Sequence, residues 1–407
     1  MKRRQFVKAS GLILGGLTVA RQVSAGDPCP PGGLEALGGT SGGALACPRP
    51  SGPAPAWVAD LQTNQWTGLS NVNTMDAVYA PNTGQYAVNG PRQVMGAWSG
   101  AILATGLGNY GSMVHWGGGH ADYYGNELYR FDLETLTWIR MNDPSPHCGS
   151  IASTNLPNGL FPDGTPGVPH TYDMICYRSA ANEYVAAGRE YNNSGFGLYN
   201  MVSRFNLDTR TWATHNTEPS GIATRHMDCI YDAGRDVMWA VNTYSGGSDW
   251  HKWDFATNAW TTYSMSGTDS LGAAQYVPTR DCIVYVNLAG TMYGLDTANP
   301  GDRVLLTKTG SFPSISSNNA DPMFWSSELG SLIFCKSGTG NLYRVTPPSG
   351  DWKTGTWTVS PISASGSSGL HDSNGVYKKF QVAEWGSIVV AILNERPTQN
   401  CYAIRLQ

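Results

Sequence analysis

The feature that most constrains the fold is a stretch of 27 residues, 112–138, with the sequence SMVHWGGGHADYYGNELYRFDLETLTW. A short apolar run at residues 113–116 ends in three glycines, which leave the backbone free to turn. Residues 127–133 alternate polar and apolar side chains, as a half-buried strand does. A polar turn at residues 132–135 then leads to Thr137 and Trp138, which begin another strand. The stretch therefore predicts three consecutive antiparallel strands.

Weaker copies of this pattern recur along the chain. The Phe-Asp-Leu…Trp part recurs at residues 58–66, 205–212 and 253–260, without its Trp at 293–297, and Trp357 fits the last strand of a further unit. Hairpins made of a strand, a polar turn and a more apolar strand fit seven segments, namely 75–90, 101–119, 173–188, 227–241, 273–287, 322–335 and 380–393. Repeated units of this kind predict an all-β fold, a β-propeller of four-stranded blades. Seven blades are preferred, and six are the alternative because residues 66–138 are too few for two complete blades.

The two ends of the repeat region predict how the ring closes. Residues 401–406 form a last strand with nothing after it, and the hairpin around Trp66 can supply the missing outer strand. Such pairing would cover a sheet edge and tie the two ends together. Either end can offer the third strand of the closing blade, and the sequence leaves that choice open.

The N-terminal residues predict export. Residues 2–8, KRRQFVK, are a twin-arginine pattern, followed by an apolar stretch at 12–20 and small residues before a cleavage point after Ala25. The apolar stretch is far shorter than the ~20 residues that a membrane span needs. We therefore expect a signal peptide at 1–25, a flexible Gly- and Pro-rich leader at 26–56, and a propeller at 57–407 in the periplasm or outside the cell.

Charge and cysteine content narrow the classes of partner. The first 25 residues hold five basic and no acidic side chains, which leaves 21 basic against 30 acidic residues and a net charge of −9. This balance argues against a nucleic-acid partner. Eight cysteines follow the cleavage point, and an oxidising compartment favours disulfides, with Cys29 and Cys47 the nearest pair. No CxxC occurs, so a structural zinc site is not expected. Separately, we expect the protein to be a monomer.

Polar residues in the loops that enter and leave the innermost strands are the candidates for function, because these loops crowd one mouth of the channel. Three consecutive blades carry titratable side chains at equivalent positions there. The candidates for catalysis are His120, His170, Tyr172 and Arg189, and the candidates for substrate binding are Tyr191, Arg225, His226, Tyr244 and His371. The alternative for the glycine run is that it packs the blade while His120 or Asp122 satisfies loop backbone. His115, inside an apolar strand, is expected to be a hydrogen-bonded core histidine.

These residue types suit proton abstraction from an anionic sugar. The carbon beside the carboxylate of a uronate loses its proton readily only if the carboxylate is neutralised, which an arginine does through a bidentate ion pair. A histidine or tyrosine then removes the proton, and another protonates the departing glycosidic oxygen. The same set can instead bind a metal through its histidines or hold a carbohydrate without cleaving it.

GGGHADYYGNE followed by YRFDL, with HTYD one blade later, resembles secreted bacterial kelch-type propellers, a group that includes ulvan-lyase-like polysaccharide lyases. The resemblance implies a lyase that cleaves an anionic, uronate-containing polysaccharide by β-elimination and requires no cofactor. By repeat position, it makes His120 the histidine after the glycine run, His170 or Tyr172 the acid/base and Arg189 the neutralising group.

Two alternatives remain open. A further histidine of those lyases has no counterpart at residues 98–101, which favours a non-catalytic propeller that binds carbohydrate or protein. A metal-dependent oxidase of the galactose-oxidase type is the third hypothesis, although the Tyr-His dipeptide of those enzymes is absent. Twin-arginine export is often used by proteins that fold around a cofactor, so a structural or catalytic divalent metal remains an open hypothesis. The sequence does not identify the ligands of such a metal.

Overall fold

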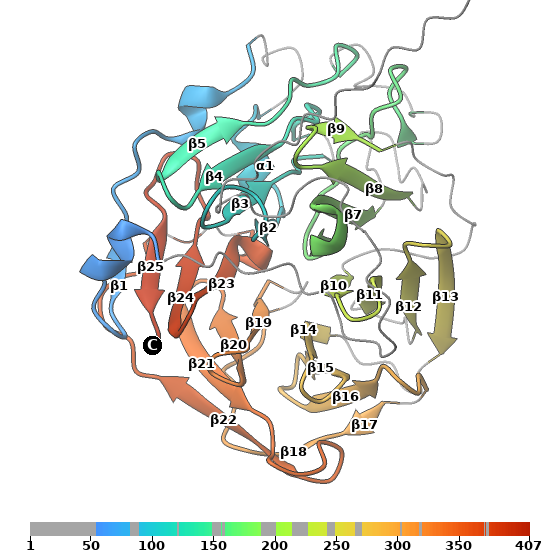
Figure 1. Cartoon of the computed structure of the whole chain (residues 1–407), viewed down its shortest axis with the longest axis vertical. Helices are drawn as coiled ribbons and strands as arrows, with labels where there is room; N and C mark the ends of the chain where they lie inside the picture. The colour runs from blue at the N-terminus through green and yellow to red at the C-terminus, as the bar shows by residue number, and fades with distance from the viewer. Residues whose placement is uncertain are drawn as a thin grey trace, which may run out of the picture.

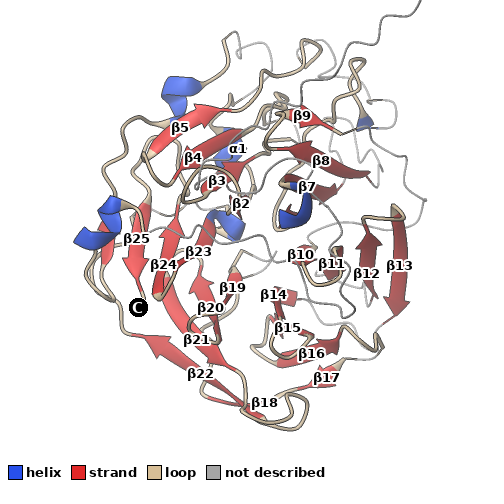
Figure 2. Cartoon of the chain, viewed as in Figure 1, coloured by secondary structure: helices blue, strands red, loops and turns tan. Residues whose placement is uncertain are grey.

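The computed structural model describes residues 54–81, 89–119, 122–148, 156, 159–188, 201–213, 227–241, 249–264, 271–301, 303–316, 320–369, 371 and 374–407. These residues form six sheets arranged around a common centre (Figure 1). Strands make up nearly all of the regular structure, and the helices are single turns (Figure 2). The prediction of an all-β propeller with four-stranded blades is confirmed. The preferred count of seven blades is wrong, and the six-bladed alternative is correct.

The first three blades each follow the chain from the centre outward. Blade 1 contains β2 (Ala101–Ala104), β3 (Ser112–His115), β4 (Tyr129–Asp132) and β5 (Thr137–Arg140). Blade 2 contains β6 (Ile175–Arg178), β7 (Glu183–Gly188), β8 (Met201–Asn206) and β9 (Thr211–Trp212). Blade 3 contains β10 (Asp228–Asp232), β11 (Val237–Val241), β12 (Asp249–Asp254) and β13 (Ala259–Ser264).

The last three blades complete the ring. Blade 4 contains β14 (Leu271–Val277), β15 (Cys282–Asn287), β16 (Met292–Asp296) and β17 (Val304–Leu305). Blade 5 contains β19 (Met323–Ser326), β20 (Ser331–Lys336), β21 (Asn341–Thr346) and β22 (Thr356–Ile362), with β18 (Thr307–Thr309) added in parallel to β22. Blade 6 contains β23 (Phe380–Trp385), β24 (Ile388–Leu393), β25 (Tyr402–Arg405) and β1 (Trp66–Gly68). The first strand of every blade contacts the first strands of both neighbouring blades, so the ring is closed.

Closure of the ring uses both ends of the described chain. β25 is the third strand of blade 6, and β1 pairs with it as the fourth, with Trp66 opposite Ile404 and Gly68 opposite Tyr402. The expectation that Trp66 lies in the outer strand is confirmed, and the C-terminal segment supplies the third strand. Pairing across the two ends covers the edge that β25 would otherwise expose.

The error in the blade count comes from the segment before blade 1. Residues predicted as a hairpin at 75–90 instead begin with a 3-10 helix, η2 (Met75–Val78), and α1 (Gln93–Gly96) follows before β2; residues 82–88 lie outside the described part. Similarly, the predicted repeat at 58–66 begins with the 3-10 helix η1 (Ala56–Asp60). Met75 and Met95 are fully buried in a cluster shared with blades 1 and 6. Both side chains cover blade faces, so a buried apolar residue such as Met75 can suggest a strand where none forms.

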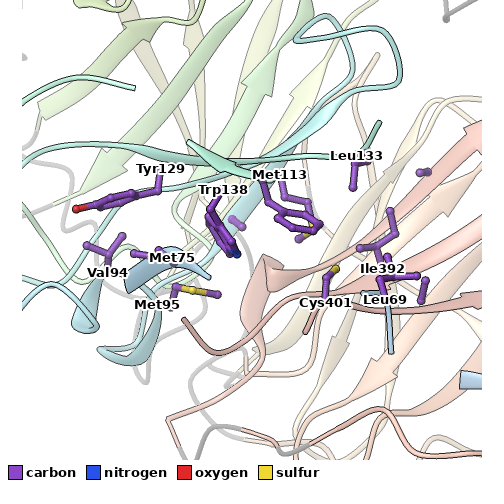
Figure 3. Close-up of a cluster of buried hydrophobic side chains, with 14 of the residues drawn as sticks. Leu69, Met75, Val94, Met95, Met113, Tyr129, Leu133, Trp138, Ile392 and Cys401 are labelled. Atoms are coloured by element: carbon purple, nitrogen blue, oxygen red, sulfur yellow. The ribbon is translucent and has the colours of Figure 1, made fainter. Parts of the chain in front are cut away.

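This cluster joins the first and last blades. Figure 3 shows Met113 and Trp138 of blade 1 in one cluster with Ile392 and Cys401 of blade 6. Of the eight cysteines, the six in the described part are buried free thiols, whereas Cys29 and Cys47 lie outside it, so a disulfide between those two stays a prediction. No helix in the described ranges is long and apolar enough to cross a membrane.

The Phe-Asp-Leu…Trp pattern has a local physical cause. Asp132 accepts the backbone N–H groups of Glu134 and Thr135 on one oxygen, both at 3.0 Å, and so shapes the turn between β4 and β5. Phe131 lies directly opposite Trp138 across the two strands, and their ring centroids are 5.3 Å apart. Blades 2 and 3 repeat both features, with turns at Asn206 and Asp254 and the ring pairs Phe205–Trp212 and Trp253–Trp260.

Replacing Asp132 with alanine should lower the free energy of unfolding by about 2 kcal/mol, because two turn N–H groups in a partly buried place lose their acceptor. Urea unfolding of the purified variant measures this loss. Asp254→Ala removes the same acceptor from an exposed turn, where water can replace it, and should cost less than about 1 kcal/mol. Equal losses at the two positions would contradict the assignment of Asp132 as a partly buried turn acceptor.

Candidate functional site

Three of the predicted site residues lie in the described part, and all three precede an inner strand. His170 and Tyr172 lie in the segment that leads into β6, and His371 lies in the segment that leads into β23. Because neighbouring strands run antiparallel, the ends of the second strands lie on the same side of the ring as these segments. The other predicted residues fall outside the described part, and their roles stay predictions: His120, Arg189, Tyr191, Arg225, His226 and Tyr244.

His170 is held by a carboxylate from the neighbouring blade. Its Nε2 lies 3.1 Å from Oδ2 of Asp122, which comes from the loop after β3. The His170 side chain is only 4% exposed and that of Asp122 is 21% exposed. The Asn89 side chain donates to the other Asp122 oxygen at 2.7 Å. An ionised carboxylate in this position favours the His170 tautomer with its proton on Nε2 and fixes the direction of the ring.

The glycine run explains how these two residues meet. A Cβ on Gly119 would lie 1.9 Å from the carbonyl oxygen of Val168, and a Cβ on Gly117 would lie 2.2 Å from Oγ of Ser99. Glycine at position 119 permits the close approach of the loop after β3 to the segment leading to His170, and glycine at position 117 permits its approach to the segment leading into β2. Packing of the glycines against the blade was predicted as an alternative to a functional role. In the structure the same packing brings Asp122 to His170, so the two interpretations do not exclude each other.

Aromatic rings form a row through the mouth. The Trp98 ring centroid lies 5.0 Å from that of His170, and the Tyr172 ring lies 5.8 Å from His170 in an edge-on arrangement. Tyr172 in turn meets Tyr377 edge-on at 5.6 Å. Such edge-to-face contacts are favourable and hold each ring in a defined direction. The row crosses three blades, because Trp98 leads into blade 1, Tyr172 into blade 2 and Tyr377 into blade 6.

The three tyrosine and tryptophan residues of this row share a rare backbone conformation. Trp98, Tyr172 and Tyr377 have φ angles of 48°, 45° and 49°, and each stands three residues before its inner strand. Positive φ in a bulky residue costs on the order of 1 kcal/mol and is concentrated at functional positions. Backbone hydrogen bonds to neighbouring blades support it, from Tyr172 to the Trp98 carbonyl and from Tyr377 to the Ala320 carbonyl. Trp98 and Tyr377 were not among the predicted site residues, although an aromatic residue three positions before a strand was a usable signal.

Beneath the aromatic row, a buried lysine crosses the centre of the ring. Lys378 Nζ donates to the carbonyl oxygens of Asp173 and Ile175 in blade 2, both at 2.9 Å, and to that of Cys229 in blade 3 at 2.5 Å. It also lies 3.6 Å from Oδ1 of Asp228. Blade 3 stands opposite blade 6 in the ring order, so one side chain joins the two halves. Lys378 was not among the predicted site residues; a lysine pair beside an apolar strand was the available signal.

Two carboxyl groups accompany this lysine. Burial raises the pKa of Asp228 to about 6, although Lys378 opposes the shift. Burial also raises the pKa of Asp173 well above its usual value, helped by the nearby Asp228 carboxylate. The backbone N–H of Ala274 in blade 4 donates to Asp228 at 2.7 Å, so this group ties a further blade to the network. We interpret the network as the structural floor of the mouth.

A cavity of about 190 Å³ occupies the centre on the other side of this floor. Inner strands of all six blades line it with mostly apolar side chains, through Ile102, Leu103, Ile175, Cys176, Tyr177, Cys229, Ile230, Tyr231, Gln275, Phe324, Lys378 and Gln381. Sites for small ligands usually exceed about 300 Å³, so this cavity is too small for a sugar chain. The mouth is the better place for chemistry on a polymer.

His371 has its own partners, distinct from those of His170. Its Nδ1 lies 2.7 Å from Oε2 of Glu395, and its Nε2 lies 2.9 Å from Oγ of Ser368. Neither Ser368 nor Glu395 was predicted as a site residue. Within the described ranges no group of three or more His, Cys, Asp or Glu side chains is placed to hold a metal ion.

The prediction that His115 is a core histidine is confirmed, but the prediction that it is hydrogen-bonded is wrong. The side chain is fully buried in β3, but neither ring nitrogen has a hydrogen-bond partner among the described residues. Its ring packs on that of Trp138 at 5.2 Å. Burial, with a smaller contribution from the Lys379 charge, lowers the pKa of His115 to about 3. His115 is therefore a neutral core residue that resists protonation.

Comparisons with known proteins do not assign the chain to a family. A scan against protein-family models finds no match, and no curated protein matches the chain in sequence. Among solved structures, Hsv2 of Kluyvelomyces marxianus matches with a TM-score of 0.31 and 11% sequence identity, over 61% of this chain and 66% of that chain. At this TM-score the match carries no argument about function. The sheet topology establishes the propeller, and the resemblance to kelch-type lyases stays a prediction.

Proposed function

We propose that the mouth beside His170 is the active site of an exported lyase that cleaves a uronate-containing polysaccharide by β-elimination. The observation that carries the proposal is the His170–Asp122 pair, which lies between the Trp98 and Tyr172 rings. A histidine whose ring is fixed by a carboxylate is suited to accept or donate a proton at a defined place. Half-buried Trp98 offers an aromatic surface beside it for the apolar face of a sugar ring.

In this proposal, each residue has a separate role in the reaction. His170 removes the proton from the carbon beside the uronate carboxylate, and Asp122 stabilises the imidazolium that forms. Tyr172 or His120 donates a proton to the departing glycosidic oxygen while a carbon–carbon double bond forms in the sugar. Arg189 pairs with the carboxylate and stabilises the enolate-like intermediate. The reaction balances without a cofactor, because the proton lost by the sugar carbon is matched by the proton gained by the leaving oxygen.

A panel of uronate-containing polysaccharides, incubated with the protein that begins after residue 25, tests this proposal. The expected result is growing ultraviolet absorbance from the unsaturated product, together with new reducing ends. Binding of a polysaccharide without any unsaturated product, across a broad panel, would reject the lyase.

A non-catalytic carbohydrate-binding propeller is the second candidate. Tyr172 favours it, because the residue is only 8% exposed and its ring packs on His170 and Tyr377, which makes this part of the mouth rigid. This alternative expects a polysaccharide to be retained on an affinity gel and never shortened. Formation of new reducing ends that depends on His170 would exclude it.

A further inference from the structure

A second hydrogen-bonded constellation stands where blades 5 and 6 meet. Ser368 and His371 lie in the segment between β22 and η7 (Tyr377–Lys379), and Glu395 follows β24 directly. Oγ of Ser368 is 2.9 Å from Nε2 of His371, and Nδ1 of His371 is 2.7 Å from Oε2 of Glu395. Neither Ser368 nor Glu395 takes part in the mouth beside His170, so this constellation is separate from the proposed lyase site.

The order of the three groups along this series of hydrogen bonds matters chemically. The serine meets one ring nitrogen, and the carboxylate meets the other. This is the arrangement in which a histidine takes the serine proton while a carboxylate orients the ring and stabilises the imidazolium. A hydrogen-bonded brace for a loop would not need the acid, the histidine and the hydroxyl in that order.

The surroundings hold the three groups in place. Glu395 is fully buried, and the Arg396 side chain donates to the His371 carbonyl oxygen at 2.7 Å. Oε1 of Glu395 has no hydrogen-bond partner among the described residues, so the described contacts of this carboxylate are directed at His371 alone. Buried polar atoms in proteins are normally hydrogen-bonded, and one left without a partner needs an explanation, of which a catalytic role is one.

A glycine makes room beside the serine. Gly340 has a φ of 68°, and a Cβ on it would lie 2.1 Å from Oγ of Ser368. Any other residue at position 340 would therefore displace the hydroxyl. Ser368 itself is only 4% exposed, so a bulky acyl group could not approach its oxygen and the substrate must present a small one.

From this geometry we propose that Ser368, His371 and Glu395 form the catalytic triad of an ester hydrolase that acts on small acyl esters, with acetyl esters as the preferred class. Oγ of Ser368 attacks the ester carbonyl, and its proton passes to Nε2 of His371. The bond from the acyl carbon to the alcohol oxygen breaks, and the departing alkoxide takes that proton. Water, activated by His371 in turn, cleaves the acyl-serine, which releases the carboxylic acid and restores Ser368.

Two measurements on the purified, folded chain test the proposal. A fluorophosphonate probe, followed by peptide mass spectrometry, should label Ser368 in the unmutated protein. Hydrolysis of p-nitrophenyl acetate should fall at least about a hundredfold in Ser368→Ala, and comparably in His371→Gln, because the members of a triad act as one unit. Glu395→Gln should lower the rate while leaving some labelling of Ser368, since the orienting group alone is lost.

The neighbouring Ser367 provides the matched control. It is exposed and accepts a hydrogen bond from the Gly369 backbone, so Ser367→Ala should keep both labelling and hydrolysis. Because labelling of the unmutated protein needs no variant, a variant that fails to fold does not affect that result. Absence of label on Ser368, label on Ser367 instead, or full hydrolysis by folded Ser368→Ala would each overturn the proposal.

Discussion

Replacing Lys378 with methionine is expected to lower the free energy of unfolding by about 4 kcal/mol, the usual cost of removing one partner of a buried charge network. The ammonium group is the shared donor to three backbone carbonyls from two other blades. Without it, these oxygens lose a charged donor, and the Asp228 carboxyl loses the cation that opposes the rise in its pKa. Methionine keeps nearly the same side-chain volume, so the loss reports the charge and the hydrogen bonds rather than a cavity.

Urea unfolding of the variant measures this effect, with Lys353→Met as the control. Lys353 Nζ lies 2.6 Å from Oδ2 of Asp296, a shorter ion pair than that of Lys378, but its side chain is 40% exposed. Exposed ion pairs contribute at most about 1 kcal/mol, so the control should lose little. If Lys378→Met also lost less than about 1 kcal/mol, the network would not be a structural floor.

Replacing His115 with leucine should make the protein more resistant to acid. The pKa of His115 is about 3 in the folded protein and about 6.5 in an unfolded chain, so between these values the unfolded chain binds more protons. The free energy of unfolding therefore falls as the pH drops from 6.5 towards 3. At pH 4.5 this histidine alone accounts for about 3 kcal/mol of the loss.

The comparison is between unfolding free energies at pH 7.5 and at pH 4.5, for the unmutated protein and for His115→Leu. At pH 7.5 the histidine is neutral in both states, so any difference there reports packing against Trp138. The variant should lose about 3 kcal/mol less than the unmutated protein between the two pH values. Parallel losses would show that His115 has a hydrogen-bond partner or water access when folded.

Local patterns in the sequence predicted the blades well. The turn at Asp132 and the ring pair Phe131–Trp138 involve residues within ten positions of each other, so the Phe-Asp-Leu…Trp pattern marks them directly. The same patterns misled at Met75, because a 3-10 helix that covers a blade face also buries an apolar side chain, as a strand would. Whether such residues pair as strands or pack on a blade depends on the rest of the ring.

The site was less predictable because its contacts cross blades. Repeat position pointed to His170 and Tyr172, but their partners come from other blades. Lys378 bonds the Asp173 carbonyl 205 residues away in sequence, which no local pattern encodes. Likewise, His371 is paired with Glu395, which lies 24 residues later in the sequence, directly after β24. Spacing along the chain identified candidate positions in the mouth, whereas the pairs between them depend on ring closure.

The most direct test of the proposed lyase is the turnover of His170→Asn per folded molecule, on the polysaccharide that gives the strongest signal in the panel. General acid–base catalysis contributes about 10²–10⁴-fold, so the account predicts a loss of at least about a hundredfold per folded molecule, whatever the change in melting temperature. His147→Asn serves as the control and should keep full activity, because His147 lies in the segment that follows β5, the outermost strand of blade 1. A folded His170→Asn protein that turns over as fast as the unmutated chain would contradict the central claim.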